Sequence, residues 1–241
     1  MAVAVEDEAL YAVVSGAVPA TIEEVIATMQ AIDSVLPNDD GLKWFNRLYL
    51  SVTDQVDLQP PDGGWKDAAW LSGLDVIFAG LYFSALKSHL EGGAETPSAW
   101  RALMDARRTM GIDRIQFALA GMNAHINHDL ALALLATDTQ QQVVPDKGSA
   151  QHVDYEAVNE LLSAVMPVAL NMLAVDVLGV LAEDTGKVGR LLAFWNLCKA
   201  RDMAWDFADQ LRMLTGPLHT TALCMQDQMT GVIGRAILAF E

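Results

Sequence analysis

The residues best suited to chemistry gather in one apolar stretch of the sequence, residues 115–137. The polar side chains at its centre are those of Asn123, His125, Asn127, His128 and Asp129. Asp129 is the only formal charge in the stretch. Polar side chains in the middle of an otherwise apolar helix must be buried, and buried polar groups need partners. We therefore expect this stretch to be the central helix of the fold and to carry the functional site.

His125 and Asp129 are four residues apart, so on a helix they share one face, about 40° apart. This spacing lets one helix present two ligands to the same metal ion. It suits a structural hydrogen bond between a histidine nitrogen and the carboxylate equally well. Asn123 and Asn127 form a second pair with the same spacing on the opposite side of the helix, and both are catalytic candidates.

Two more carboxylates are candidates for the same site. Asp75 is the only charge in the stretch 71–86, and a lone carboxylate in an apolar helix is paired, metal-bound or protonated. We expect Asp75 to be buried and to face the central helix; the alternative is an ion pair with Arg201. Asp154 stands where a helix is expected to start, either as an N-cap or as a further metal ligand.

Tyr82, His128 and Arg201 complete the catalytic candidates. Tyr82 follows Asp75 by seven residues and so shares its helical face. His128 or Tyr82 would act as general acid or base, and Arg201 would contact a substrate anion. The adjacent pair His128–Asp129 is similar to the dyad of HD-type phosphohydrolases. Adjacent helical residues point about 100° apart, however, and the upstream histidines of that family are not evident.

The elements that must position these residues are helices, because apolar residues recur with helical period and no stretch alternates as a strand would. Helices are expected over about 22–36, around 45–52, and over 66–90, 97–110, 115–137, from 154, over 188–214 and from 219. We predict one all-α domain over residues 1–241. It would be an orthogonal bundle of about eight helices around the central buried helix 115–137. Residues 1–19 would form an N-terminal arm and residues 138–151 a mobile loop near the site.

The composition bounds the class of protein. The 241 residues are 52% hydrophobic and 19% charged, which is typical of a compact globular chain. The net charge of −16 disfavours nucleic acid and anionic membranes as partners, because their phosphates would be repelled. Polar residues interrupt the longest apolar stretches, and the N-terminus has no basic region like that of a signal peptide. We expect a cytoplasmic protein without stable membrane insertion, with a homodimer as one option.

Two details of the last helices also lead to expectations. Cys198 and Cys224 lie in apolar helical contexts, so both are expected to be buried rather than reactive. Gly231 and Gly234 give the last helix a face of small residues that suits close packing.

Several segments together resemble a family of helical bacterial proteins classed as a domain of unknown function. They are FNRLYLSVTD (45–54), LDVIFAGLY (74–82), GMNAHINHDLALAL (121–134), the helix start at Asp154 and the segment 200–208. The motif GMNAHIN-x-DL is specific, and the resemblance covers most of the chain. It implies an all-α domain with a shared polar centre, and it supplies no reaction.

The arrangement of an HxxxD pair on a central helix and an aspartate on an earlier helix is also distantly similar to zinc-dependent phospholipase C and P1-type nucleases. In that similarity His125, Asp129 and Asp75 match metal ligands. The sequence departs from the pattern because it has no second HxxxD/E motif and no histidine shortly after Asp129. The similarity therefore implies one metal ion, two at most, or none.

Three functions remain open from the sequence. The first is a metal-dependent hydrolase of a small, largely apolar metabolite, with zinc or iron held by His125, Asp129 and Asp75, and Asp154 as a fourth ligand. The second is a metal-free lyase, cyclase or isomerase of small-molecule (secondary-metabolite) biosynthesis. In it a carboxyl group of tuned pKa, Asp75 or Asp129, would do the chemistry. The third is a non-catalytic helical protein that binds a small molecule.

Overall fold

The structure is a computed structural model that describes residues 3–58, 60–93, 95–175 and 196–239. Every regular element in these residues is helical, which confirms the all-α prediction. The α-helices are α1 (Glu8–Val14), α2 (Ile22–Val35), α3 (Leu42–Leu58), α4 (Ala68–Leu90), α5 (Ser98–Ala106), α6 (Arg114–Ala124), α7 (Leu130–Gln141), α8 (Ala150–Val175), α10 (Leu197–Met213) and α11 (Gly216–Leu238). Two short elements, η1 (Val5–Asp7) and η2 (His125–Asp129), complete the described part.

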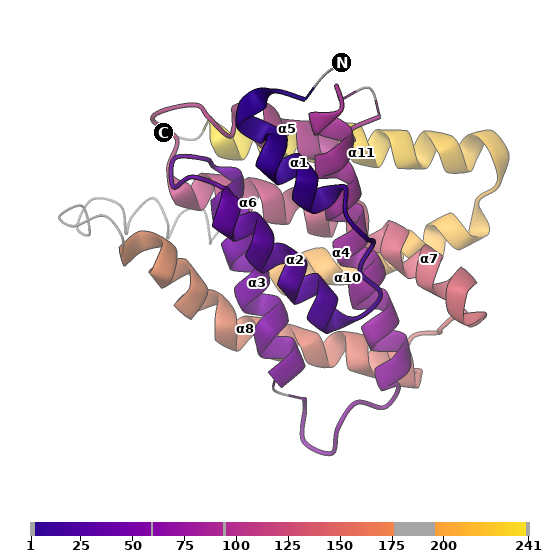
Figure 1. Ribbon diagram of the computed structural model, residues 1–241. Helices are drawn as coiled ribbons and strands as arrows, with labels where there is room; N and C mark the ends of the chain where they lie inside the picture. Colours follow the sequence, from indigo (N-terminus) through magenta and orange to yellow (C-terminus); the bar gives the residue numbers. More distant parts are fainter. Residues whose placement is uncertain (1–2, 59, 94, 176–195, 240–241) are drawn as a thin grey trace.

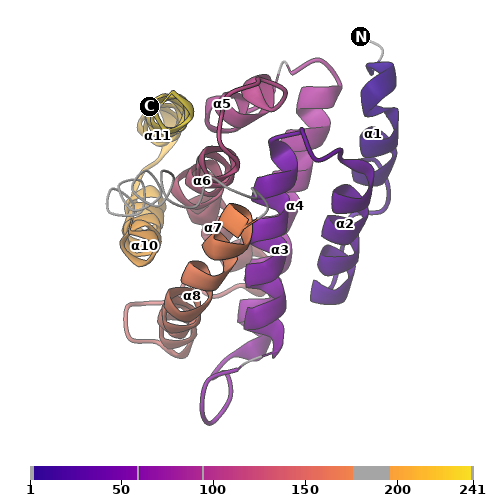
Figure 2. The ribbon, with the colours of Figure 1, turned by 90° about the vertical axis from the view of Figure 1, so that its left-hand side faces the viewer.

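The helices cross one another at steep angles, as the orthogonal bundle requires (Figure 1). In Figure 2, α1 to α4 run lengthwise, whereas α5, α6, α10 and α11 are seen nearly end-on. The continuous segment of α6, η2 and α7 lies between two groups of helices. It contacts α3 and α4 on one side and α10 and α11 on the other. If this segment is counted as one helix, the described residues hold nine helices.

Helix starts follow from capping side chains. The Thr21 hydroxyl accepts a hydrogen bond from the Glu24 amide at 3.3 Å, and the Glu24 carboxylate accepts one from the Ala20 amide at 2.7 Å. The α2 capping box is therefore present, with Glu24 reaching one residue beyond the N-cap. At the start of α4, Asp67 Oδ1 accepts from the Trp70 amide at 3.1 Å. These side chains satisfy amides that have no partner within their helix.

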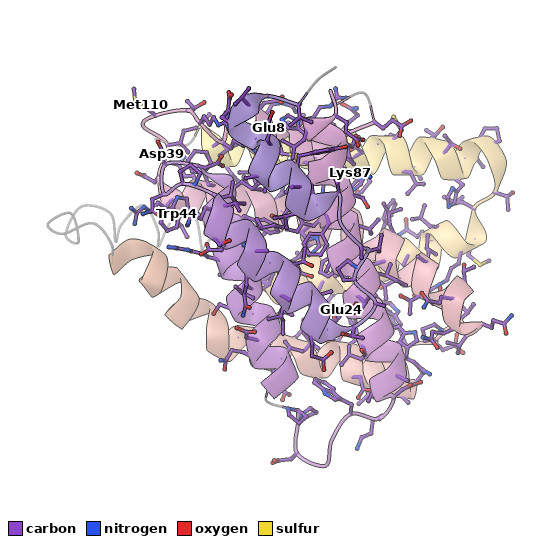
Figure 3. The ribbon with its side chains drawn as sticks, in the orientation of Figure 1. Glu8, Glu24, Asp39, Trp44, Lys87 and Met110 are labelled. Atoms are coloured by element: carbon purple, nitrogen blue, oxygen red, sulfur yellow. The ribbon has the colours of Figure 1, made fainter. Side chains whose placement is uncertain are left out.

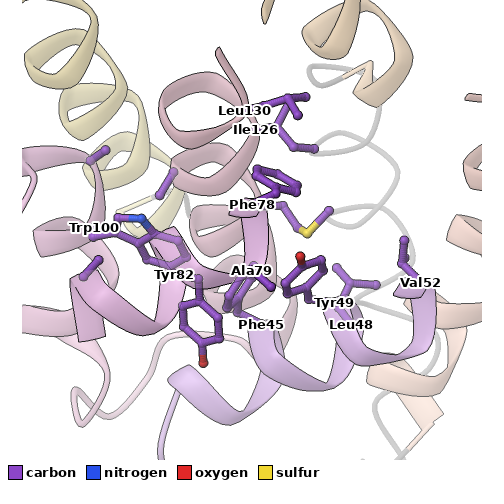
Figure 4. Close-up of a cluster of buried hydrophobic side chains, with 14 of the residues drawn as sticks. Phe45, Leu48, Tyr49, Val52, Phe78, Ala79, Tyr82, Trp100, Ile126 and Leu130 are labelled. Carbon is purple, nitrogen blue, oxygen red and sulfur yellow. The ribbon is translucent and has the colours of Figure 1, made fainter. Parts of the chain in front are cut away.

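The centre of the core is a group of aromatic rings from α3, α4 and α5 that pack against the central helix (Figure 4). The Phe45 ring meets the edges of Tyr82 and Trp100 at centroid distances of 5.0 and 5.2 Å. Tyr82 stacks on Trp100 at 5.2 Å. Offset and edge-to-face pairs of this kind fix the relative positions of the helices that carry them.

Glycines allow the closest helix contacts. A Cβ atom added to Gly121 would lie 2.3 Å from the Phe45 ring, so α6 approaches α3 only because this residue has no side chain. A Cβ at Gly231 would lie 2.5 Å from Ser98 Oγ, and one at Gly234 would lie 2.9 Å from the Ala102 methyl group. The expected small-residue face of the last helix is thus confirmed, and it packs against α5.

The segment 1–19, expected as an arm, contains the additional helix α1, which packs on α2 and α4. Leu10 is buried there. Asp7 forms ion pairs with Arg107, at close range, and with Arg108 at 2.7 Å. Hydrophobic burial and paired charges therefore fix this part of the N-terminal segment on the bundle.

Two other expected boundaries shift. The segment 138–151 is helical at both ends, so the connection between α7 and α8 comprises residues 142–149. Asp138, at the end of α7, is buried and bonded to Arg212 Nε at 2.8 Å. The helix expected over 188–214 begins at Leu197, with Asn196 as its cap. Residues 188–195 of that expectation lie outside the described residues.

Among the described residues, α4 alone is long and apolar enough to cross a membrane by length and composition. Half of its most apolar window is buried inside the bundle. The core helix of a globular protein meets the same criterion, so this helix carries no argument for a membrane.

Candidate functional site

The central helix changes its winding at its polar centre. Residues His125–Asp129 form a π-helical turn between α6 and α7. The amide of Leu130 donates to the carbonyl of His125, five residues back, in place of the four-residue spacing of an α-helix. Single π turns inside α-helices are rare and are often found at functional sites. The sequence predicted an uninterrupted α-helix, because apolar periodicity does not show one extra residue in a turn.

Asp129 is the hub of the polar centre. Its carboxylate is almost fully buried, with 2% of the residue exposed, and it accepts three hydrogen bonds. Oδ2 accepts from Trp100 Nε1 at 2.9 Å and from His125 Nδ1 at 3.0 Å, and Oδ1 accepts from His128 Nδ1 at 2.7 Å. An ionised carboxylate can only accept, so each histidine must carry a proton on Nδ1.

The three ionisable groups of this centre have different pKa shifts. Burial alone would raise the pKa of Asp129, but hydrogen bonds from His125 and His128 outweigh it and hold that pKa below its ordinary value. Burial lowers the pKa of His125, and the hydrogen bond to Asp129 offsets this only in part. Burial would also lower the pKa of His128, but Asp129 and Asp227 together raise it. The shifts thus favour the ionised form of Asp129, the protonated form of His128 and the neutral form of His125.

Asp227 of α11 extends the polar chain. Its Oδ1 lies 3.6 Å from His128 Nε2. Its two oxygens also accept from the amides of Ser98 and Ala99 at 3.0 and 2.9 Å, which caps α5 where Pro97 offers no side-chain cap. Sequence reasoning missed Asp227, although a signal existed. Asp227 is the only acid in an apolar helix, the same signal that identified Asp75.

The His128 ion pair predicts a pH-dependent difference in stability. A histidine whose pKa is raised by folding stabilises the protein fully below its ordinary pKa of 6.5, and less as pH rises through the folded-state pKa. The free energy of unfolding of the wild type should therefore exceed that of His128→Gln most below pH 6.5, with the gap narrowing toward pH 9. Urea unfolding of both proteins over this range measures the gap. A gap that is constant with pH would contradict the ion pair.

The other side of His125 faces a small cavity. Its ring stacks on Phe78 at 3.5 Å and meets Tyr49 at 4.5 Å. Its Nε2 is buried and has no hydrogen-bond partner among the described protein atoms. With Nδ1 protonated, Nε2 carries a lone pair, so it is an acceptor without a donor. His125 lines a cavity of about 50 Å³ together with Tyr49, Phe78, Asp75, Arg201 and apolar side chains.

A larger pocket of about 390 Å³ lies next to this cavity, between the start of α2 and the facing sides of α3 and α4. The two share Thr53, Val56, Leu71 and Asp75 in their walls. The outer pocket has the size typical of small-molecule sites, 300–1,000 Å³. At about 50 Å³, the inner cavity alone is smaller than the engineered cavity of roughly 150 Å³ that is known to bind benzene. A ligand would therefore occupy the outer pocket and insert one end toward His125.

Asp75 lies in the wall shared by both spaces. It was expected to be buried, but the residue is only partly buried. The physical reason is that its side of α4 faces the pocket rather than the packed core. Its charge contributes to raising the pKa of buried Tyr49, after the larger effect of burial. Asp75 and His125 thus line the same cavity, as the sequence predicted, while Asp129 lies behind the His125 ring.

Asp154 lies apart from this centre. It is buried at the start of α8, and its oxygens accept from the amides of Lys66 and Asp67 at 2.8 and 2.6 Å. Asp154 was expected to cap its own helix or to bind a metal, but α8 already begins at Ala150 and Asp154 lies inside it. Its carboxylate instead caps the segment that leads into α4, which is distant in sequence.

Tyr82 does not face Asp75. Its hydroxyl donates to Asn46 Oδ1 at 3.3 Å in the core, and burial raises its pKa far above the ordinary value. A phenol with such a pKa does not exchange protons near neutral pH. Figure 4 shows the Tyr82 hydroxyl directed away from Tyr49 and Phe78, which line the cavity.

Asn123 and Asn127 hold α11 in place. Asn123 Nδ2 donates to the Thr230 carbonyl at 2.9 Å, and Asn127 Nδ2 donates to Asn123 Oδ1 at 3.0 Å. The Asn127 carbonyl accepts from Gln226 Nε2 at 2.6 Å. These hydrogen bonds from side-chain amides join the central helix to α11 on the side away from the cavity walls.

Arg201 reaches the cavity wall from α10. Its Nε donates to Asn159 Oδ1 at 2.7 Å and its Nη2 to the Tyr155 carbonyl at 3.0 Å. The guanidinium also stacks over the Tyr155 ring at 4.2 Å. Arg201 thus fixes α10 on α8 and contributes positive charge to the inner cavity.

The predicted metal ligands do not converge on one point in this arrangement. The facing atoms of His125 and Asp129 bond to each other, and both Asp154 oxygens bond to backbone amides. In the part of the chain that the structure describes, no three His, Cys, Asp or Glu side chains are grouped as metal ligands. Metal binding therefore stays a prediction, in which His125 Nε2 and Asp75 are the groups on the cavity.

The described part of the protein is thus an all-helical bundle in which a buried His–Asp centre lies beside a pocket. The model of the family of unknown function DUF5995 matches residues 22–240. The chain belongs to this family. No curated protein and no solved structure matches it. Membership confirms the expected relation to a helical family of unknown function, and it attaches no reaction to the site.

Proposed function

We propose that the protein binds a small, largely apolar molecule in the pocket between α3 and α4 and acts on it without a metal, as an isomerase or lyase. His125 Nε2 would be the base that takes a proton from the bound molecule. Two observations carry this proposal: His125 Nε2 is buried without a hydrogen-bond partner, and the His125 residue lines the cavity. A buried acceptor without a donor costs about 1–3 kcal/mol, and a ligand with a donor group recovers that cost.

The hydrogen bonds behind the ring suit a base. Asp129 Oδ2 accepts a hydrogen bond from His125 Nδ1–H and so fixes the tautomer in which Nε2 is unprotonated. When Nε2 takes a proton from the ligand, the imidazolium that forms lies beside the Asp129 carboxylate, which stabilises it. The aromatic walls, Tyr49 and Phe78, exclude water from the transfer.

Two matched probes test this assignment. Phenol can donate a hydrogen bond to Nε2, and toluene has nearly the same shape without a donor. The ratio of the toluene Kd to the phenol Kd should fall by a factor between about 2 and about 13 in His125→Phe, the equivalent of one hydrogen bond of about 0.5–1.5 kcal/mol. Ligand-observed NMR titrations of wild type and variant measure the ratio. Circular dichroism checks beforehand that the two proteins are folded to the same extent.

Tyr82→Phe is the matched control, because the hydroxyl that it removes donates to Asn46 and does not line the cavity. This variant should keep the wild-type ratio. The role as a base is read from solvent deuterium entering the α-carbon of cyclohexanone, which His125→Phe should abolish. Equal ratios in wild type and His125→Phe would refute the binding mode. Binding without deuterium exchange would favour the non-catalytic binding protein.

A metal-dependent hydrolase is the second candidate, and one observation favours it. Histidines that bind metals usually donate their other ring N–H to a carboxylate, as His125 does to Asp129. His125 Nε2 and Asp75 would then hold the ion at the cavity, and the distant similarity to zinc-dependent phospholipase C belongs to this candidate. Elemental analysis of protein purified without added metal decides between the two. A stoichiometric metal that is lost in His125→Phe would replace the metal-free proposal.

A further inference from the structure

The outward face of α11 is apolar along most of its length. Leu218, Met225, Met229 and Val232 expose between 60% and 67% of their surface. Single exposed apolar residues are normal on a folded protein, but a continuous apolar face marks an interaction site. Cys224 lies about 120° around the helix from these residues. Cys198 and Cys224 were both expected to be buried because their neighbours are apolar, but Cys198 is only partly buried and Cys224 is exposed.

The spacing along this face is that of a helix-pairing seam. The intervals between successive apolar residues alternate between four and three. The seam comprises Leu218, Ala222, Met225, Met229, Val232 and Ala236. This alternation is the heptad pattern by which two helices bury a shared apolar line.

Among the described residues, the fold covers little of this seam: Ala222 is partly buried against the core, and the other five members are exposed. The residues of α11 that pack on α5 and α6, including Gly231 and Gly234, lie on the opposite side of the helix. In Figure 2, α11 is seen end-on at the edge of the bundle, with no described helix beyond it. Helix α11 thus has two apolar faces: one packs on α5 and α6, and the seam is the other.

Charge distinguishes this face from the rest of the protein. The chain has 31 acidic and 15 basic residues, so most of its surface repels a second copy. The only acid of α11, Asp227, bonds inward to α5, and the exposed charge of the helix is that of Arg235. Two acidic chains can therefore approach along α11 without opposing carboxylates, whereas the remaining negative charge repels an anionic membrane.

We propose that α11 pairs with α11 of a second copy of this chain, forming a two-fold symmetric homodimer through the seam. A two-fold interface requires a surface that complements itself, and a heptad seam does so. Ala222 and Ala236 are small enough to let the helices approach closely, while the methionines adapt their shape to fill the contact. This inference rests on the outer face of α11 and is independent of the chemistry at His125.

Analytical ultracentrifugation of the full chain tests the dimer. Between about 1 and 100 µM the wild type should sediment with twice the 26.1 kDa mass of one chain. Met229→Glu places a charge at the centre of the seam and should raise the dimer Kd by roughly 100-fold or more. Because Met229 is exposed in the single chain, the helical content of the variant should equal that of the wild type.

Met110→Glu is the matched control. Met110 exposes 95% of its surface in the connection between α5 and α6, and Figure 3 shows it pointing away from the bundle. This variant should remain dimeric. Val232→Lys repeats the test with the opposite charge, so that loss of the dimer is not attributed to the acidity of the chain. A monomeric wild type, or a dimer that survives Met229→Glu and Val232→Lys, overturns the proposal.

Discussion

Asp129→Asn is expected to reduce the free energy of unfolding by about 3–5 kcal/mol, the cost of breaking a buried ion pair from one side. The carboxylate accepts from Trp100, His125 and His128, and an amide of the same shape can accept with one oxygen only. Its NH₂ group would also face a ring N–H. His128 would lose the counterion that raises its pKa. Urea unfolding at pH 7 measures the loss.

Asp105→Asn provides the control for this measurement. Asp105 carries the same side chain, but it is 68% exposed and lies 4.0 Å from His89. An exposed pair of this kind contributes about 0–1 kcal/mol, so the control should change stability little. A loss below about 1 kcal/mol in Asp129→Asn would mean that the histidines are not held by its charge.

Gly231→Ala is expected to destabilise the protein by about 1–3 kcal/mol, although alanine favours helix over glycine. Its Cβ would lie 2.5 Å from Ser98 Oγ and 2.6 Å from the Ser98 carbonyl oxygen. Backbone cannot rotate away, so α11 would have to move off α5. That movement would also disturb the bonds from Asp227 to the α5 amides.

Gly80→Ala is the opposite case in α4. A Cβ there meets no atom within 4 Å, so the helix-forming preference of alanine should stabilise the protein by about 0.5–1 kcal/mol. Thermal or urea unfolding of the two variants gives the comparison. If both substitutions shift stability in the same direction, the close contact of α11 with α5 is not as the structure describes.

The parts of the site that the sequence predicted are those fixed by local helical geometry. The His125–Asp129 contact follows from the i, i+4 spacing, and both residues lie in the π turn. The His128–Asp129 hydrogen bond was not predicted, because adjacent residues diverge on a regular α-helix. Both histidines reach the same carboxylate within the π turn, and apolar periodicity carries no signal for such a turn.

Contacts between distant segments set the remaining features. Trp100 and Asp227 enter the centre from α5 and α11, and nothing in the local pattern indicates which helix faces which. Asp75 lines the same cavity as His125, as predicted, but it is only partly buried where full burial was predicted. A lone carboxylate in an apolar helix indicates a special environment, but it does not distinguish the core from the wall of a pocket. Asp154 caps a segment nearly ninety positions earlier in the chain, which residue type alone cannot reveal.

The π turn has one further consequence, which concerns the phase of the central helix. One extra residue in a helical turn rotates everything after it by about 100° relative to regular winding. Before the turn, α6 packs on α3 and α11; after it, α7 packs on α4 and α10. The apolar faces of the two halves are thus aligned to different neighbours by a single residue of offset. The His–Asp centre lies in the π turn itself, between the two halves of the central helix that face different neighbours.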